Sequence, residues 1–434
     1  MSNSPMSGRL ALVVGGGPAP GINGVISSAT IEAVEQGIEV LGFRDGFESL
    51  VKGNADHYRR LGIDDVKAIN LRGGSILGTS RTNPAKSEES MRNVLDVLRR
   101  LNVTMLVTIG GDDTAFSGSQ VYKRAGGAVR VAHVPKTIDN DLPLPGSTPT
   151  FGFETARQVG VGIVRNLAED ARTTSRWYLI VSMGRAAGHL ALGIGKAAAA
   201  TLTIIPEEFR GRAVNIDEVC DILIGAIIKR RAKDPPSPYG VAVLAEGLLE
   251  AIGEQGLQAI MAAGQLGRYG KITRDPHGHL RLGEIEFGRM IKDRLSQRLE
   301  EIGLHVTLID KDLGYELRCA DPIPFDAEYT RDLGYGAVKF LRSEESAKYG
   351  AIISLVGGHL EPLPFDEMIN PETARMQTRR VDVNGEGYEC ARRYMIRLNA
   401  RDFAEPHRLA RLAETANMSP EAFRQRFAYL VEKK

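Results

Sequence analysis

Short runs of β-branched and aliphatic residues recur along the chain, and most of them are continuous rather than alternating with polar residues. Continuous apolar runs are typical of parallel strands that are buried on both faces of a sheet. We therefore predict buried strands that begin at Leu10 (LALVV), Val103 (VTMLVTI), Val129 (VRVAHV), Tyr178 (YLIVSM), Val241 (VAVLA), His305 (HVTLI) and Ala351 (AIISLV).

Helical patterns lie between these runs. After GGGPAPG, apolar residues recur at Ile22, Val25, Ile26 and Ala29, which is the spacing of one face of a helix. The same spacing follows a Ser-Pro helix start at residues 419–420. Strands that alternate with helices predict an α/β fold. At roughly 150 residues per domain, the 434 residues suggest two or three domains.

Composition narrows the class of protein. The chain has 55 Lys and Arg against 54 Asp and Glu, so we expect no broad positive surface for nucleic acid. Its three cysteines, Cys220, Cys319 and Cys390, form no CxxC pair, which argues against a disulfide framework or a structural zinc site. No apolar segment approaches the ~18 residues of a membrane span, and MSNSPMSGR at the start lacks the apolar core of a signal peptide. We expect a cytoplasmic protein that binds neither nucleic acid nor membranes.

Glycine is unusually frequent, with 48 residues in 434, or about 11% against a usual ~7%. Many of these glycines directly follow a predicted strand, in GGGPAPG, GGDDT, MGRAAG, AEG and VGGH. Open parallel sheets bind ligands at the carboxyl ends of their strands, where glycine lets backbone amides approach phosphate. A single glycine after a strand is more often only a turn, but glycine at so many strand ends predicts a phosphate site.

Two glycine-rich loops, residues 15–23 and 72–81, are candidates for this site, although neither has the GK[ST] of a Walker A loop or a GxGxxG fingerprint. Arg81 is either a partner for phosphoryl oxygens or an ordinary surface residue. In GGDDT, a carboxylate beside phosphate requires a hard cation, so Asp112 suggests a Mg²⁺ site; the alternative is a helix N-cap. In PKTIDND, one Asp can act as general base toward a hydroxyl while Lys136 offsets charge on a transferring phosphoryl group.

From about Arg9 to Pro364 the chain resembles the phosphofructokinases. The motifs of that family occur in the family's order, as GGGPAPGIN, GGSILGTSR, GGDDT, PKTIDND, SRWYLIVSMGR, AEG and LGYELRCADPIPFD. The resemblance implies phosphoryl transfer to the 1-hydroxyl of fructose 6-phosphate. It also implies two similar three-layer α/β domains with mostly parallel sheets and the active site in the interdomain cleft.

The same resemblance implies a division of the chain. The donor domain, for diphosphate and Mg²⁺, would take residues 1–152 plus about 317–370. The fructose 6-phosphate domain would take residues 153–316 plus about 371–434, with a C-terminal helical extension. Beyond about Met368 the resemblance fades.

Roles for single residues also follow from the resemblance. It implies that Asp139 is the base for the sugar hydroxyl, with Lys136 and Arg81 as the other catalytic residues, that Asp112 holds Mg²⁺, and that Asp141 supports the metal-bound phosphates. The donor-binding set would be Gly16, Gly17, Arg81, Asp113 and Lys136. The sugar-phosphate set would be Thr137, Asp139, Arg176, Met183, Gly184, Arg185, Glu246, Tyr315 and Arg318. Because the counterpart of Arg176 reaches a neighbouring subunit's site in this family, we expect a homodimer or homotetramer.

Two positions indicate the phosphoryl donor. The ATP-dependent branch of the family has glycine at the positions of Asp113 and Lys136, whereas the diphosphate-dependent branch has GGDD and PKTIDND, as here. Two like charges ~4 Å apart at an effective dielectric of ~20 cost on the order of 4 kcal/mol, so a carboxylate at Asp113 would repel an ATP α-phosphate. The alternative is that Asp113 only caps the following helix and ATP still binds. The expected activity is therefore a reversible, diphosphate-dependent one that serves glycolysis or gluconeogenesis.

Three other functions remain as alternatives. The first is an ATP-dependent 6-phosphofructokinase. A non-catalytic regulatory subunit is disfavoured because Asp139, Asp112, Lys136 and Arg81 are all present. A nucleotide kinase with GGD after a strand would leave PKTIDND and MGR unexplained. Use of sedoheptulose 7-phosphate, small effectors and the role of Cys319 stay open.

Overall fold

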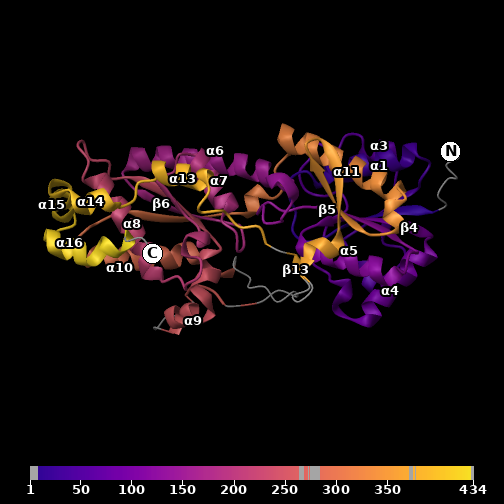
Figure 1. The fold of residues 1–434 in the computed structure, drawn as a ribbon, viewed down its shortest axis with the longest axis horizontal. Coiled ribbons are helices and arrows are strands. Elements are labelled where there is room, and N and C mark those ends of the chain that lie inside the picture. The colour runs from indigo at the N-terminus through magenta and orange to yellow at the C-terminus, as the bar shows by residue number, and fades with distance from the viewer. Residues whose placement is uncertain are drawn as a thin grey trace. The chain divides into compact units, whose positions relative to one another are not determined.

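The computed structural model describes residues 8–262, 268–271, 273, 284–370, 375–376 and 378–431. Met1 to Ser7, for which we expected no signal segment, lie outside the described residues. The chain divides into two compact units (Figure 1). The first contains the described parts of 8–156 and 315–379, and the second contains those of 157–314 and 380–431.

The first unit is built on a seven-stranded sheet with the order β11-β10-β5-β4-β1-β2-β3. All neighbours are parallel except β2 with β3 and β10 with β11, which are antiparallel pairs at the two edges. The strands are β1 (Arg9–Val14), β2 (Val40–Phe43), β3 (Tyr58–Leu61), β4 (Val103–Gly110), β5 (Arg130–Pro135), β10 (Ala351–Val356) and β11 (His359–Pro364).

Helices cover both faces of this sheet, which makes three layers. Leu10, Leu12 and Val14 of β1 pack into one core, with helices α1 and α11, while Ala11 and Val13 pack into the opposite core, with α4 and α5. Every second residue of the strand thus enters the same core, as the pleat of a strand requires. The helices are α1 (Ile22–Glu35), α2 (Glu48–Val51), α3 (Ile63–Val66), α4 (Glu88–Arg100), α5 (Asp112–Ala125), α11 (Pro324–Arg342) and α12 (Phe365–Met368). A separate short hairpin joins β12 (Ile369–Asn370) to β13 (Arg375–Met376).

The second unit has a four-stranded, wholly parallel sheet with the order β7-β8-β6-β9. Its main core lies between this sheet and helices α8 and α10, and α7 lies on the other side of β6 (Figure 1). The strands are β6 (Trp177–Ser182), β7 (Leu202–Ile204), β8 (Gly240–Ala245) and β9 (Leu308–Leu313). The helices are α6 (Phe153–Thr174), which begins in the first unit, α7 (His189–Ala197), α8 (Ile216–Arg231), α9 (Leu248–Ala262) and α10 (Phe287–Glu300).

The C-terminal segment of the second unit is helical and packs on the rest of that unit. Its helices are α13 (Glu386–Tyr394), α14 (Ala400–Ala404), α15 (Pro406–Thr415) and α16 (Pro420–Phe427). Phe423 and Phe427 of α16 are fully buried in the main core. At the end of α8, Lys229 donates to Asp402 at 2.6 Å and to the carbonyl of Arg397 at 2.9 Å. Lys229 therefore ties the end of α8 to the C-terminal segment.

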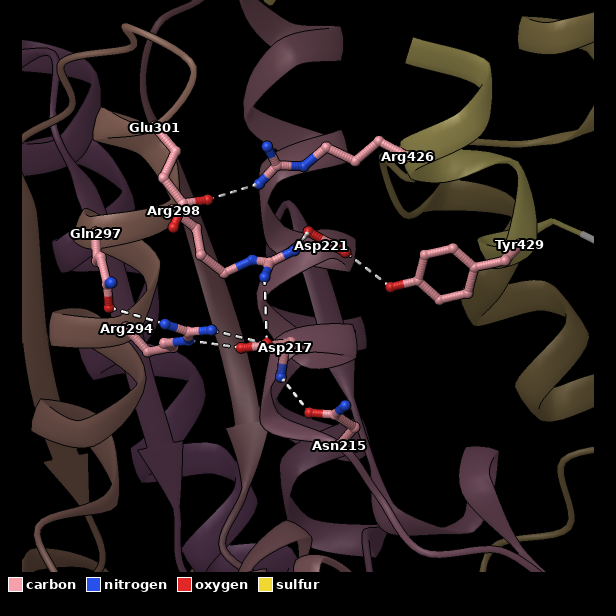
Figure 2. Close-up of polar contacts among 9 residues, drawn as sticks. All are labelled: Asn215, Asp217, Asp221, Arg294, Gln297, Arg298, Glu301, Arg426 and Tyr429. Atoms are coloured by element: carbon pink, nitrogen blue, oxygen red, sulfur yellow. Dashed lines mark hydrogen bonds and ion pairs between the residues drawn. The ribbon is translucent and has the colours of Figure 1, made fainter. Parts of the chain in front are cut away.

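Charged pairs join α8 to α10 and to the end of the chain (Figure 2). Asp217 and Asp221 lie one turn apart on α8, and Arg294 and Arg298 lie one turn apart on α10. Arg294 donates to both carboxylate oxygens of Asp217, at 2.6 and 2.8 Å, and Arg298 donates to Asp221 at 2.6 Å. The hydroxyl of Tyr429, just after α16, donates to the other oxygen of Asp221 at 2.8 Å. This network fixes the C-terminal residues against two helices of the unit.

The α/β class with mostly parallel sheets is confirmed. Six of the seven predicted strands form as expected, but HVTLI was misplaced, since β9 begins only at Leu308 and continues through polar residues to Leu313. β9 lies at the edge of its sheet, so half of it can be polar. The pattern also missed β2, β3, β7 and β11, which are short or lie at edges. None of the described helices is long and apolar enough to cross a membrane.

The contact between α1 and α11 predicts opposite effects of adding one methyl group at two mid-helix glycines. A Cβ on Gly334 of α11 would lie 2.0 Å from the hydroxyl oxygen of Ser28 and 2.7 Å from the carbonyl oxygen of Val25, whereas a Cβ on Gly162 of α6 would meet nothing within 4 Å. We expect Gly334→Ala to lower the free energy of unfolding by about 1–3 kcal/mol. Gly162→Ala should raise it by about 0.5–1 kcal/mol. Urea unfolding of both variants measures this, and equal midpoints would contradict the close approach of the two helices.

Candidate functional site

In the first unit, the loop after β1 places glycine where charged side chains approach the backbone. The amide of Gly16 donates to the carbonyl of Ser80 at 2.9 Å, which joins this loop to the second glycine-rich loop. A Cβ on Gly17 would lie 1.7 Å from a guanidinium nitrogen of Arg318, so this position leaves the space that Arg318 occupies. Gly16 has φ +80°, which favours glycine.

The second glycine-rich loop is held by Asn23 of α1. Its side-chain amide donates to the carbonyls of Arg72 and Gly73, at 3.0 and 3.2 Å, and its side-chain oxygen accepts from the amide of Ile76 at 2.9 Å. The amide of Gly73 also donates to Asp321 at 2.8 Å. Asn23 and Asp321 therefore position a candidate binding loop, a role that the sequence motifs did not reveal.

Arg81, Asp139, Tyr315 and Arg318 come close together in the first unit. Burial and, next, the charge of Arg81 lower the pKa of Arg318, whereas Tyr315 and Asp139 act in the opposite direction. The Arg318 guanidinium lies 5.5 Å from the centre of the Tyr315 ring, and Tyr315 is 70% exposed. The structure thus brings together four of the residues predicted to bind ligand or catalyse.

Lys136 lies at the carboxyl end of β5 and is almost fully buried. Its backbone amide donates to the carbonyl of Gly110 at 2.7 Å, and its ammonium group donates to the carbonyl of Gly17. The neighbouring His133 adds no positive charge at neutral pH, because burial lowers its pKa from 6.5 to about 3. The end of β5 therefore places an ammonium group beside the first glycine-rich loop.

The acidic pair of GGDDT lies in the first turn of α5. The cap residue of this helix is Gly111, so Asp112 and Asp113 are the first two helical residues. The alternative that either carboxylate serves as the N-cap is therefore wrong. Both side chains instead lie at the positive end of the helix dipole, which favours carboxylates. Among the described residues, no group of three or more His, Cys, Asp or Glu side chains is arranged to hold a metal ion.

The PKTIDND loop places Asp139 in a nearly buried position, 8% exposed, with its amide donating to the Thr137 hydroxyl at 3.0 Å. Arg379 braces this loop: its guanidinium donates to the carbonyl and the side-chain oxygen of Asn140, and its amide donates to the carbonyl of Asp141 at 2.6 Å. Burial lowers the pKa of Arg379. Arg379 was not among the predicted site residues, because it is 238 positions from Asp141 and carries no motif.

In the second unit, the carboxyl ends of β6 and β8 bring together Met183, Gly184, Arg185 and Glu246. One carboxylate oxygen of Glu246 accepts from the amides of Gly184 and Arg185, at 3.2 and 3.3 Å. Glu246 is 8% exposed, so these bonds form away from bulk water. Its carboxylate therefore holds the MGR loop.

Glu207 is a second support for this loop, and sequence reasoning missed it. One of its carboxylate oxygens accepts from the amide of Gly188 at 2.9 Å and from the amide of Val381 at 3.1 Å. Its side chain is almost fully buried. The sequence around it, PEEF, contains no motif that distinguishes Glu207 from an ordinary surface residue. Only its burial in the folded chain identifies it as a structural support.

Arg176 lies apart from the other predicted residues of the second unit. It directly precedes β6, whereas Met183 directly follows it. Six strand residues at ~3.3 Å each separate the two ends by roughly 20 Å. Within one chain, Arg176 therefore cannot join Met183 and Arg185 around one small ligand.

The fold and these loops are those of an α/β protein with glycine, cationic and acidic side chains at the carboxyl ends of parallel strands. This is the arrangement that phosphoryl-transfer enzymes use to position phosphates. The chain belongs to the phosphofructokinase family, since the family model described as "Phosphofructokinase" matches residues 9–341. Enzymes of this family generally use a divalent metal ion.

Two relatives match over nearly the whole chain. A protein of Thermotoga maritima named "Pyrophosphate--fructose 6-phosphate 1-phosphotransferase" is 51% identical over 98% of this chain and 100% of its own length. A protein of Naegleria fowleri with the same name is 48% identical over 98% of this chain and 96% of its own length.

Solved structures of phosphofructokinases share the fold. The pyrophosphate-dependent phosphofructokinase of Marinobacter aquaeolei matches with a TM-score of 0.64 and 17% identity, over 89% of this chain and 90% of that chain. The phosphofructokinase of Pichia pastoris in the T-state matches with a TM-score of 0.65 and 22% identity, over 85% of this chain but only 36% of that longer chain.

Proposed function

We propose that this chain transfers a phosphoryl group reversibly from diphosphate to the 1-hydroxyl of fructose 6-phosphate, giving fructose 1,6-bisphosphate and phosphate. The observation that carries the proposal is the near full-length match to two relatives named for this reaction, at 51% and 48% identity. The presence of Asp113 and Lys136 at the two donor-discriminating positions supports the same donor.

In this proposal Asp139 takes the proton from the 1-hydroxyl, whose oxygen then attacks the terminal phosphorus of diphosphate. The bond from that phosphorus to the bridging oxygen breaks, and phosphate leaves. Lys136 and Arg81 offset the negative charge that spreads over the transferring group. The near burial of Asp139, the contact of Lys136 with the Gly17 carbonyl and the bracing of the loop by Arg379 support these roles.

We assign the metal to Mg²⁺, with Asp112 as its protein ligand and Asp141 supporting the metal-bound phosphates. Mg²⁺ is usually bound by one or two carboxylates together with substrate phosphates rather than by an all-protein cage. A carboxylate at the first turn of α5, next to a glycine-rich loop, fits that pattern. When bound, Mg²⁺ would neutralise charge on the phosphates.

The diphosphate donor would contact Gly16, Gly17, Arg81, Asp113 and Lys136, and we assign it to the first unit. The sugar phosphate would contact Thr137, Asp139, Arg176, Met183, Gly184, Arg185, Glu246, Tyr315 and Arg318. That these residues meet in one interdomain cleft stays a prediction, as do the donor and sugar domains with boundaries near 152 and 317. We also place the reaction in the cytoplasm.

We infer a homodimer or homotetramer. Arg176 lies at the opposite end of β6 from Met183, so it would have to serve a site on a neighbouring chain.

The donor is tested directly with purified protein, fructose 6-phosphate and Mg²⁺. We expect fructose 1,6-bisphosphate to form with diphosphate and much less of it with ATP. Phosphorus NMR measures both reactions. Asp139→Ser should reduce the diphosphate reaction by about 100-fold or more while the protein stays folded, because the general base is lost. Comparable turnover with ATP would favour an ATP-dependent enzyme instead.

Asp113 is tested by replacing it with the glycine of the ATP-dependent branch. We expect Asp113→Gly to raise kcat/KM for ATP at least about tenfold, because a repulsion on the order of 4 kcal/mol is removed. Asp112→Gly is the matched control one residue earlier, and it should lose turnover with both donors because the metal ligand is lost. An Asp113→Gly variant without any gain toward ATP would remove this carboxylate as the determinant of donor choice.

The shared site is tested by mixing two damaged chains. Arg176→Ala and Asp139→Ser should each be nearly inactive alone. If Arg176 serves the neighbouring chain, a mixed dimer regains one complete site. A random 1:1 mixture of dissociated and reassembled dimers should then recover about a quarter of the wild-type activity. No recovery, with mixed particles confirmed by mass, would place both residues in the same chain's site.

A further inference from the structure

A pocket with a volume of about 200 Å³ lies within the second unit and contains none of the residues assigned above to the reaction. Its walls come from the η3 turn (Pro206–Phe209), from helix α8 and from the C-terminal segment. The charged residues that line it are Glu208, Arg212, Glu218, Arg392 and Arg397. Phe209, Ile222, Leu398 and Leu430 provide apolar walls.

Two of the three arginines already have carboxylate partners. Arg397 donates to both oxygens of Glu208, at 2.6 and 3.0 Å. Arg212 donates to both oxygens of Glu218, at 2.6 and 2.5 Å. Each pair cancels its own charge, so the one positive charge left over in the pocket belongs to Arg392.

The side chain of Arg392 has no hydrogen bond or ion pair with any residue in the described part of the chain. Burial and, next, the charge of Arg397 lower the pKa of Arg392, whereas Glu208 and Tyr388 act in the opposite direction, so its charge is partly desolvated. The adjacent Arg393 differs in both respects, because it is exposed and donates to Glu389 at 3.0 Å. A partly desolvated guanidinium, with five donors and no acceptor among the described residues, can bind an anionic ligand.

The walls around Arg392 are fixed before any ligand binds. Tyr429, which lines the pocket, donates to Asp221, and Asp221 is held by Arg298 of α10 (Figure 2). Arg397 also donates to the carbonyl of Thr203 of β7, which anchors it to the sheet. A preformed site loses little conformational entropy on binding.

We propose that this pocket binds a small organic carboxylate. The carboxylate oxygens would accept two hydrogen bonds from Arg392, and its single negative charge matches the single uncompensated charge of the pocket. The apolar part of the ligand would lie against Phe209, Ile222 and Leu398. A phosphate group carries more than one negative charge at neutral pH and would leave an excess beside Glu208 and Glu218.

Butyrate is the probe for this site, and ligand-observed NMR measures its binding to the full-length protein. We expect wild type and Arg393→Ala to bind butyrate equally, and Arg392→Ala to bind it at least about tenfold more weakly, because a charge-assisted bidentate contact is lost. Arg392→Lys keeps the charge without the planar fork, so its affinity should lie between the two. The uncharged analogue butyramide should bind wild type and Arg392→Ala alike.

The outcomes separate this site from the reaction, because no turnover is measured. Equal butyrate affinity for wild type, Arg392→Ala and Arg392→Lys would overturn the proposal. The proposal would also be overturned if Arg392→Ala weakened the binding of inorganic phosphate but not the binding of butyrate. Thermal melting of each variant shows that it is folded, and if Arg392→Ala does not fold, the comparison of Arg392→Lys with Arg393→Ala decides.

Discussion

The first unit depends on the close approach of three backbone segments around one threonine. A Cβ on Gly15, after β1, would lie 2.4 Å from the hydroxyl oxygen of Thr114, and a Cβ on Gly110, at the end of β4, would lie 2.3 Å from the same atom. Any side chain at either glycine would push α5 away from the two central strands. Because Asp112 and Asp113 form the first turn of α5, their position depends on this contact. The glycine excess is therefore partly a packing requirement and not only a means of binding phosphate.

The sequence predicted the parts of the fold in which local pattern and burial agree. Continuous apolar runs identified β1, β4, β5, β6, β8 and β10, each of which pairs with a neighbouring strand on both sides. It failed where a strand lies at an edge: β9 (LIDKDL) has polar, partly exposed positions, and β3 has two exposed arginines. Edge strands hydrogen-bond on one side only, so their composition resembles that of loops.

The predicted site shows the same division. Residues inside motifs could be placed at a strand end from the sequence, and Lys136 does follow β5 and Glu246 does follow β8. Arg379 and Glu207 were missed because they act through long-range contacts with loops. Arg379 bonds to Asn140, 239 positions earlier, and Glu207 bonds to Val381, 174 positions later. No spacing rule covers such pairs, and only the folded chain brings them together.

The η3 turn shows how two adjacent residues of one type acquire different tasks. Glu207 is turned toward the amides of Gly188 and Val381, and Glu208 is turned toward Arg397 and the pocket beside it. Both carboxylates are largely buried, so each needs partners to offset the cost of desolvation. Because one short turn carries both, a shift of the turn that improved one set of contacts would strain the other. The four residues of the η3 turn therefore help to set the geometry of both the MGR loop and the pocket that contains Arg392.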